Sequence, residues 1–136
     1  MASSFLHFGL TCSDPGKIED FYCRFFGFVR VQVMRPGADQ IVIIRSGSLS
    51  LELFQASEKS GLPRPGEDGC KYPGWRHLCF SVDDLEKKLL EIGSAAEITL
   101  GPLDLGEMIP GMKICWIADP EGNIIELNQG YKETLI

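Results

Sequence analysis

The chain of 136 residues contains the same pattern twice, and this internal repeat limits the folds that are open to it. His7 begins the run HFGLTCSDPG, and His77, the second of only two histidines, begins the run HLCFSVDDLE. Glu52 follows in LELFQ and Glu126 in IELNQ, after similar intervals. A duplicated unit places matching residues at matching positions. The two imidazoles and two carboxylates are therefore expected to converge on one divalent metal ion.

The first copy of the repeat predicts a strand, a helix and three further strands. Asp14 can cap the helix, Pro15 suits its first turn, and Gly27 suits its end. The apolar residues of the helix fall at helical spacing on one stripe, which consists of Ile18, Phe21, Tyr22 and Phe25. The predicted strands are residues 5–12, 28–34, 40–45 and 49–55.

The second copy repeats this order after a segment rich in proline and glycine. Asp83 or Asp84 can cap a helix that Gly93 ends and that carries Leu85, Leu89 and Ile92. The predicted strands are residues 76–82, 96–100, 112–118 and 123–129. The fold class is therefore α+β, with two βαβββ modules at about 4–56 and 75–129. The linker is 57–74, and the length indicates a single domain over 1–136.

Side chains alternate between the two faces of a strand, which predicts what surrounds the four candidate ligands. On this basis the faces that carry the histidines and glutamates also carry Gly9, Thr11, Phe54, Cys79, Ser81 and Asn128. We expect these residues to line a substrate pocket. A glutamate inside an apolar strand is costly unless it is paired or bound to a metal. The alternative for Glu52 or Glu126 is a position on an exposed strand face.

Two nitrogen and two oxygen ligands define the chemistry that such a site would support. This set suits Zn²⁺, Ni²⁺, Co²⁺, Mn²⁺ or Fe²⁺, and no other cofactor is predicted. A site with open coordination positions is catalytic and can polarise a carbonyl and hold a developing enediolate. Glu126 or Glu52 is the candidate general base.

Several motifs resemble the vicinal oxygen chelate superfamily, which contains glyoxalase I, extradiol dioxygenases and bleomycin resistance proteins. They are the H-x-G-L opening, the helix from Asp14 to Phe28, the H-L-x-F-x-V-D-D second opening and the final D-P-E-G-N-I-I-E-L. The resemblance implies cupped, barrel-like mixed sheets with the helices outside, and often a homodimer. It places the metal ligands at His7, Glu52, His77 and Glu126, a His/Glu/His/Glu set that is similar to that of glyoxalase I.

The resemblance implies a metal-dependent lyase or isomerase of the glyoxalase type that acts on a small carbonyl or thiol-adduct substrate. The alternatives are a non-heme iron extradiol-type dioxygenase and a non-catalytic small-molecule-binding or resistance protein. Glutathione-dependent relatives carry an arginine near the end of the first strand, where this chain has Leu10, Thr11 and Cys12. The candidate substitutes are Arg30, Arg35, Arg45 and Arg76.

Composition narrows the range of partners and compartments. The net charge of −6 disfavours nucleic acid and anionic membranes as partners. The N-terminal residues lack the basic start of a signal peptide, and no apolar run approaches the length of a membrane span. The five cysteines are odd in number and lack CxxC spacing, so we expect buried, reduced thiols in a cytoplasmic protein.

Overall fold

The computed structural model describes residues 1–134, and the chain divides into two compact units after Gly61. Residues 135–136, at the end of the predicted domain, lie outside the described part. The elements of the first unit are β1 (Phe8–Cys12), α1 (Pro15–Phe26), β2 (Val29–Met34), β3 (Ile41–Ser46) and β4 (Leu49–Gln55). Those of the second are β5 (Leu78–Ser81), α2 (Leu85–Ile92), the 3₁₀ helix η1 (Gly93–Ala95), β6 (Glu97–Asp104), β7 (Lys113–Ala118) and β8 (Ile124–Gln129).

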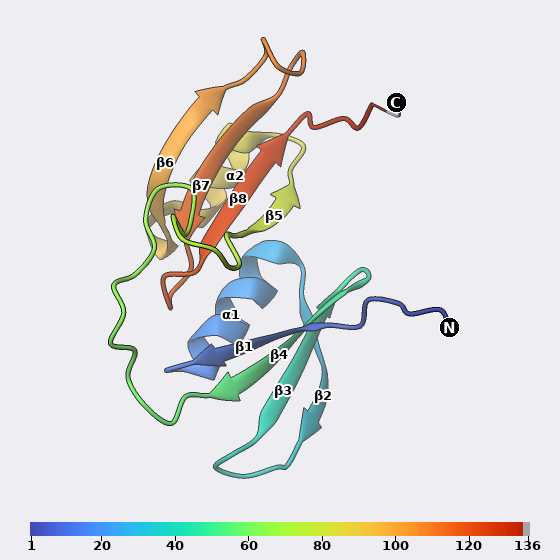
Figure 1. Cartoon of the computed structure of the whole chain (residues 1–136), viewed down its shortest axis with the longest axis vertical. Helices are drawn as coiled ribbons and strands as arrows, with labels where there is room; N and C mark the ends of the chain where they lie inside the picture. The colour runs from blue at the N-terminus through green and yellow to red at the C-terminus, as the bar shows by residue number, and fades with distance from the viewer. Residues whose placement is uncertain (135–136) are drawn as a thin grey trace. The chain divides into compact units, whose positions relative to one another are not determined.

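Both units have the same sheet topology, which confirms the α+β class and the repeated βαβββ module. The strand order is β1-β4-β3-β2 in the first sheet and β5-β8-β7-β6 in the second (Figure 1). The outer pairs β1–β4 and β5–β8 are parallel, and the other neighbours are antiparallel. Each sheet is open, because its edge strands do not pair with each other.

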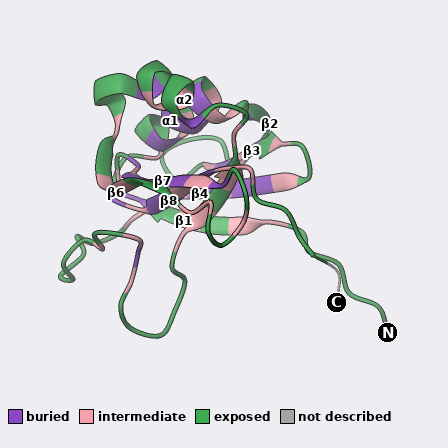
Figure 2. Cartoon of the chain, turned by 90° about the horizontal axis from the view of Figure 1, so that it is seen from above, coloured by how far each residue is buried: buried purple, intermediate pink, exposed green. Residues whose placement is uncertain are grey.

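Helix α1 buries its predicted apolar stripe against the sheet of the first unit. The Asp14 side chain accepts a hydrogen bond from the Lys17 backbone N–H at 3.1 Å, and Gly27 ends the helix with φ of 67°. The buried face consists of Ile18, Phe21, Tyr22 and Phe25, and the buried apolar residues of β3 and β4 are Val42, Ile44, Leu51 and Leu53. Figure 2 shows buried residues on one side of the helix and exposed residues on the other.

The sheet of the second unit is buried on both faces. Asp84 caps α2, and the helix side of the sheet carries Cys115, Ile117, Ile125 and Leu127, all buried. The opposite face carries a second apolar cluster, which consists of Met112, Ile114, Trp116 and Ile124. Leu100, Leu105 and Ile109 pack against that cluster. The face that carries Glu126 therefore has an apolar floor.

Some predicted boundaries were wrong in detail. Strands β1 and β5 begin at Phe8 and Leu78, so His7 and His77 lie immediately before the strands. Strand β6 runs to Asp104, beyond the predicted residue 100. The predicted bounds of the modules and the linker stay predictions, and the residues from Leu62 onward group with the second compact unit.

The cysteines and helices allow two further statements. All five cysteines are free, but only Cys12 and Cys115 are buried, and the prediction of burial was wrong for Cys79, which is exposed. Cys23 and Cys70 are half-buried. Among residues 1–134, no helix has the length and apolar character needed to cross a membrane.

Candidate metal centre

The repeated register places a histidine beside a glutamate in each module. Gly9 of β1 pairs with Glu52 of β4, and Cys79 of β5 pairs with Glu126 of β8. His7 and His77 each lie two residues before these strand positions and therefore on the same face of the chain. The parallel pairing of the first and last strands of each module is what brings residues so distant in sequence together.

The two His–Glu pairs have the same geometry. His7 Nε2 lies 2.9 Å from Glu52 Oε2, and His77 Nε2 lies 2.9 Å from Glu126 Oε2. The side chains of Glu52 and Glu126 are each 14% exposed, and those of His7 and His77 are 34% and 20% exposed. Each module therefore presents one nitrogen and one oxygen donor in a largely enclosed position.

The donor chemistry of each pair fits a divalent cation. An ionised carboxylate accepts only, and an imidazole nitrogen that is free to ligate also carries a lone pair. Two such atoms 2.9 Å apart share a hydrogen of the imidazole nitrogen, and a metal ion that both atoms ligate can take the place of this hydrogen. Within residues 1–134 the structure contains no group of three or more His, Cys, Asp or Glu side chains arranged for a metal. Each module by itself thus offers two candidate donor atoms.

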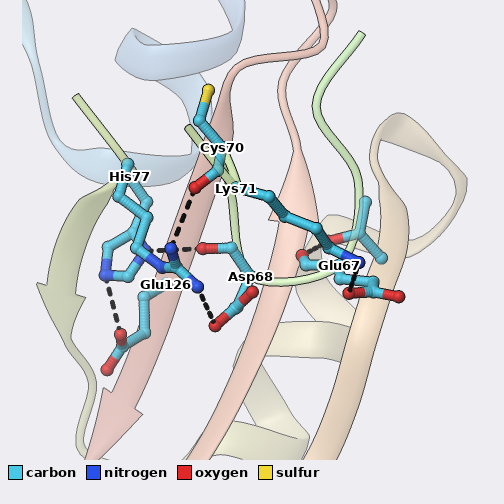
Figure 3. Close-up of polar contacts among 8 residues, drawn as sticks. Glu67, Asp68, Cys70, Lys71, His77 and Glu126 are labelled. Carbon is cyan, nitrogen blue, oxygen red and sulfur yellow. Dashed lines mark hydrogen bonds and ion pairs between the residues drawn. The ribbon is translucent and has the colours of Figure 1, made fainter. Parts of the chain in front are cut away.

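In the second module, further groups hold the pair in place. The Asn128 amide Nδ2 donates to Glu126 Oε1 at 2.9 Å. The Cys79 thiol also hydrogen-bonds Glu126, and its desolvation and this neighbouring carboxylate raise the pKa of Cys79 to about 12. On the other side, His77 Nδ1 lies 2.9 Å from the Asp68 carbonyl oxygen (Figure 3). The thiol is therefore neutral near pH 7 and acts as a donor.

The first module has a different set of neighbours at the matching positions. Gly9 takes the place of Cys79, and Phe54 takes the place of Asn128. A Cβ at Gly9 would lie 3.5 Å from the Phe54 ring, so the space beside Glu52 is bounded by an aromatic edge. Among the described residues, His7 is the sole hydrogen-bonding or ionic partner recorded for the Glu52 side chain.

The remaining predicted pocket residues differ in exposure. Thr11 and Ser81 are exposed, Phe54 is half-buried, and Asn128 is buried. Sequence reasoning missed Trp116, which lies directly opposite Glu126 on β7. The signal was available, because the short turn at 119–122 fixes the pairing of the two strands that it joins and thereby places Trp116 opposite Glu126.

Two buried polar atoms on this face have no partner within residues 1–134. They are Nε1 of Trp116, a donor, and Oδ1 of Asn128, an acceptor. Both residues are more than nine-tenths buried. Buried polar groups are normally satisfied by protein, water or ligand.

Three of the four arginines considered as substitutes for the missing first-strand arginine already have partners. Arg30 forms two 2.6 Å contacts with Glu19, and Arg76 lies 2.7 Å from Asp68 Oδ2. Arg45 Nε donates to the Ser50 hydroxyl at 3.0 Å. Engaged guanidinium groups are poor candidates for binding a substrate carboxylate.

Comparison with known proteins finds one matching family and many solved structures that share this fold. A sequence model described as Glyoxalase/Bleomycin resistance protein/Dioxygenase superfamily matches residues 4–127. A glyoxalase family protein from Enterococcus faecalis is 25% identical, with 92% of this chain and 96% of that chain covered and a TM-score of 0.67. No curated protein sequence matches this chain significantly.

Two further solved structures have other described roles. TnmS3, an antibiotic binding protein from Streptomyces sp. CB03234, is 22% identical, with 96% of this chain and 98% of that chain covered and a TM-score of 0.64. The fosfomycin resistance protein FosX from Mesorhizobium loti is 13% identical, with 99% and 95% covered and a TM-score of 0.65. At these identities the likeness establishes the fold alone.

Proposed function

This chain belongs to the glyoxalase/bleomycin resistance protein/dioxygenase superfamily, and from that premise we propose that it is a divalent-metal-dependent lyase or isomerase of the glyoxalase I type. Its substrate would be a small carbonyl compound or thiol adduct. The observation that carries the proposal is the duplicated His–Glu pair, with Nε2–Oε2 distances of 2.9 Å in both modules. In this proposal His7, Glu52, His77 and Glu126 form one metal-binding quartet.

Family membership and the donor set both support this proposal. A bound divalent ion would polarise the substrate carbonyl and so acidify the neighbouring C–H bond. The histidines would hold the ion through Nε2. One glutamate would take up the substrate proton and return it. Asn128 and His77 hold the two oxygens of Glu126, whereas His7 contacts one oxygen of Glu52. The Glu52 carboxylate is therefore the less constrained of the two and the better candidate for carrying a proton.

The substrate class follows from the groups around the pairs. The engagement of Arg30, Arg45 and Arg76 disfavours the methylglyoxal–glutathione adduct, because guanidinium groups that already have partners are poor ligands for its carboxylates. The unpartnered Trp116 N–H and Asn128 carbonyl favour a substrate that offers both an acceptor and a donor. We propose a different thiol adduct or an α-hydroxy carbonyl compound, and we expect weak turnover of the glutathione adduct.

Metal analysis tests the quartet directly. Wild-type protein reconstituted with Zn²⁺, Ni²⁺, Co²⁺, Mn²⁺ or Fe²⁺ should hold one ion per quartet. His77→Ala and Glu126→Gln should each lower occupancy strongly, since each removes a donor. Glu97→Gln, which changes an exposed glutamate on β6, is the matched control and should bind like wild type. Unchanged binding in both ligand variants would refute the site.

Proton exchange tests the reaction. The metal-loaded protein is incubated in deuterated water with thiol adducts and 2-oxo or α-hydroxy carbonyl compounds, and deuterium uptake at the substrate carbon is measured. Exchange that is lost in Glu52→Gln or Glu126→Gln, at a metal concentration that restores metal content to the wild-type level, supports proton transfer by that glutamate. Oxygen-dependent ring opening of a catechol, without exchange, would instead support the dioxygenase alternative.

A second candidate function rests on the apolar floor beneath Glu126. Trp116, Met112 and Ile114 belong to a buried, partly aromatic cluster, and side chains of this kind line most sites that bind drug-like molecules. A protein that sequesters such a molecule without chemistry is therefore the runner-up. Saturable quenching of tryptophan fluorescence by an aromatic antibiotic, with no metal bound and no product formed, would favour it.

We also propose a homodimer in the cytoplasm. The dimer is the assembly that the family resemblance implies, and the five free cysteines suit a reducing compartment. Light scattering at micromolar concentration should give about twice the chain mass. A mass near 15.1 kDa would contradict the dimer.

A further inference from the structure

The loop that precedes β5 contacts His77 on the ring edge opposite Glu126. We propose that this loop, residues 66–76, is a positioning element for His77. The loop would hold the imidazole with Nδ1 protonated and Nε2 directed at Glu126 and the metal. This inference rests on the proposed metal site but concerns residues outside the quartet, chiefly Asp68, Gly69 and Arg76. We name the segment the Asp68 loop.

Both nitrogens of the His77 ring have a hydrogen-bonding partner within the second unit. Nδ1 lies 2.9 Å from the Asp68 carbonyl oxygen, and Nε2 lies 2.9 Å from Glu126 Oε2. A carbonyl oxygen only accepts, so Nδ1 must bear the hydrogen. A metal ion would displace the hydrogen that lies between Nε2 and Glu126 and ligate Nε2, while the contact with Asp68 keeps the hydrogen on Nδ1.

The Asp68 carbonyl is itself held by several contacts. The Arg76 guanidinium donates from Nη2 to Asp68 Oδ2 at 2.7 Å and from Nη1 to the Cys70 carbonyl oxygen at 2.9 Å. The Gly69 N–H donates to the Gly66 carbonyl at 3.0 Å. Thr99 of β6 ties the loop to the sheet through a 2.5 Å hydrogen bond to the Glu67 carbonyl. These contacts lie within the second unit, and Figure 3 shows the loop beside His77.

Gly69 is the residue that allows this tight path. Its φ of +122° is a conformation that other residues rarely adopt. A Cβ at this position would overlap the carbonyl oxygen and the Cγ atom of Arg76. Position 69 therefore accepts only glycine without displacing the loop that carries the Asp68 carbonyl.

The first module has no equivalent of this loop. Residues 1–6 before His7 are exposed and belong to no helix or strand. Glu52 is the recorded polar partner of the His7 ring among the described residues. The His77 ring is thus held at both nitrogens, whereas the His7 ring is held at Nε2 by Glu52. A bound metal would then be ligated by one histidine whose ring has a partner at both nitrogens and by one whose ring has a partner at Nε2.

The test uses the fact that the chain has only two histidines, so a histidine-labelled sample gives only two ring spectra. In metal-free protein, long-range ¹H–¹⁵N spectra should show a Nδ1–H of His77 that exchanges slowly with solvent and none for His7. His7→Ala identifies the remaining ring. In Arg76→Met and Gly69→Ala the protection of this proton should be lost, and Arg76→Lys should restore part of it.

Zn²⁺ affinity, measured by competition with a chromophoric chelator, is the second readout. Arg76→Met should weaken Zn²⁺ binding about 10-fold, the size of effect that partners of ligating histidines commonly have. The control is Lys71→Met, which removes the exposed 2.8 Å Lys71–Glu67 ion pair from the same loop and leaves the His77 contacts in place. It should bind Zn²⁺ like wild type.

The two readouts separate this inference from the proposed function. A protected Nδ1–H without Zn²⁺ binding to any variant would support the positioning role and overturn the metal site. Zn²⁺ binding that Arg76→Met leaves unchanged, with an unprotected Nδ1–H, would overturn the positioning role alone. A loss of protection in Lys71→Met equal to that in Arg76→Met would also overturn it, because the effect would then be general loosening of the loop.

Discussion

Trp116 carries a buried indole N–H that no residue in 1–134 accepts, directly opposite Glu126 in the β7–β8 register. Leaving a buried donor unsatisfied costs about 1–3 kcal/mol. The fold keeps this cost at a position where a ligand could remove it. The unsatisfied N–H of Trp116 therefore lowers the stability of the ligand-free protein, and a ligand that accepted this hydrogen bond would recover the loss.

Replacing Trp116 separates these two roles. Trp116→Phe removes the unsatisfied donor but keeps an aromatic ring, so the free energy of unfolding should change by less than about 1 kcal/mol. Trp116→Ala should lower it by about 3–5 kcal/mol, because the apolar cluster loses its largest member. Urea unfolding of the ligand-free proteins measures both. Equal losses in the two variants would show that the N–H has a partner.

At the scale of elements, the β7–β8 hairpin fixes where Glu126 lies. Asp119 organises its turn: Oδ1 accepts from the backbone N–H groups of Glu121 and Asn123 at 2.9 Å, and Oδ2 accepts from Asn123 Nδ2 at 2.8 Å. The Asp119 residue is only 3% exposed. A slip of one residue in this register would move Glu126 to the helix side of the sheet.

Removing this turn anchor should therefore destabilise the second module. Asp119→Ala is expected to lower the free energy of unfolding by about 2–4 kcal/mol, since three hydrogen bonds to a buried carboxylate are lost. Glu107→Ala, at an exposed loop position, is the control and should stay within about 0.5 kcal/mol of wild type. A loss below 1 kcal/mol in Asp119→Ala would mean that the turn forms without its side-chain acceptor.

The sequence predicted the elements well because their signals are local. Asp14, Gly27 and Asp84 act at the helix ends as their residue types favour. Strand alternation and the repeat predicted the shared faces of the histidines and glutamates, whereas their pairing within each module depends on the parallel strand pairs that the structure shows. The loop contact of Asp68 with His77 was not predictable, because it depends on the path of a segment rich in glycine and proline. Trp116 was missed because its apolar strand reads as core and its face depends on the hairpin register.

At the scale of the whole molecule, the chain forms two compact units with one His–Glu pair in each. If the quartet binds one ion, that ion links both units and binds only folded protein. Ligands of this kind raise stability by mass action. Metal binding and cooperative unfolding are therefore expected to be coupled.

Zinc should stabilise wild-type protein strongly and the ligand variants weakly. At a free concentration about 100 times the dissociation constant, the expected gain is about 2.7 kcal/mol. Chelator treatment should remove it, and His7→Ala should show little of it. Thermal unfolding at fixed protein concentration provides the measurement. An equal gain in His7→Ala would mean that zinc binds elsewhere.

The two ways of completing the quartet make opposite predictions for mixed dimers. One chain carries His7→Ala with Glu52→Gln, and the other carries His77→Ala with Glu126→Gln. If each site combines the two modules of one chain, neither partner has a full set, and co-refolding restores no tight binding. If each site is shared between chains, the mixed dimer regains one full set. Metal content of the purified heterodimer distinguishes these cases.

The duplicated modules are similar in their backbone but unlike beside their glutamates, with Gly9 and Phe54 in one and Cys79 and Asn128 in the other. A symmetric pair of half-sites would treat the two ends of a small substrate alike. Unlike neighbours make the surroundings of the two glutamates chemically different, so the two ends of a substrate would meet different groups. A proton delivered by one glutamate would then reach one face of a planar carbon in preference to the other. If the reaction creates a stereocentre, a single enantiomer of the product is the expected signature of this divergence.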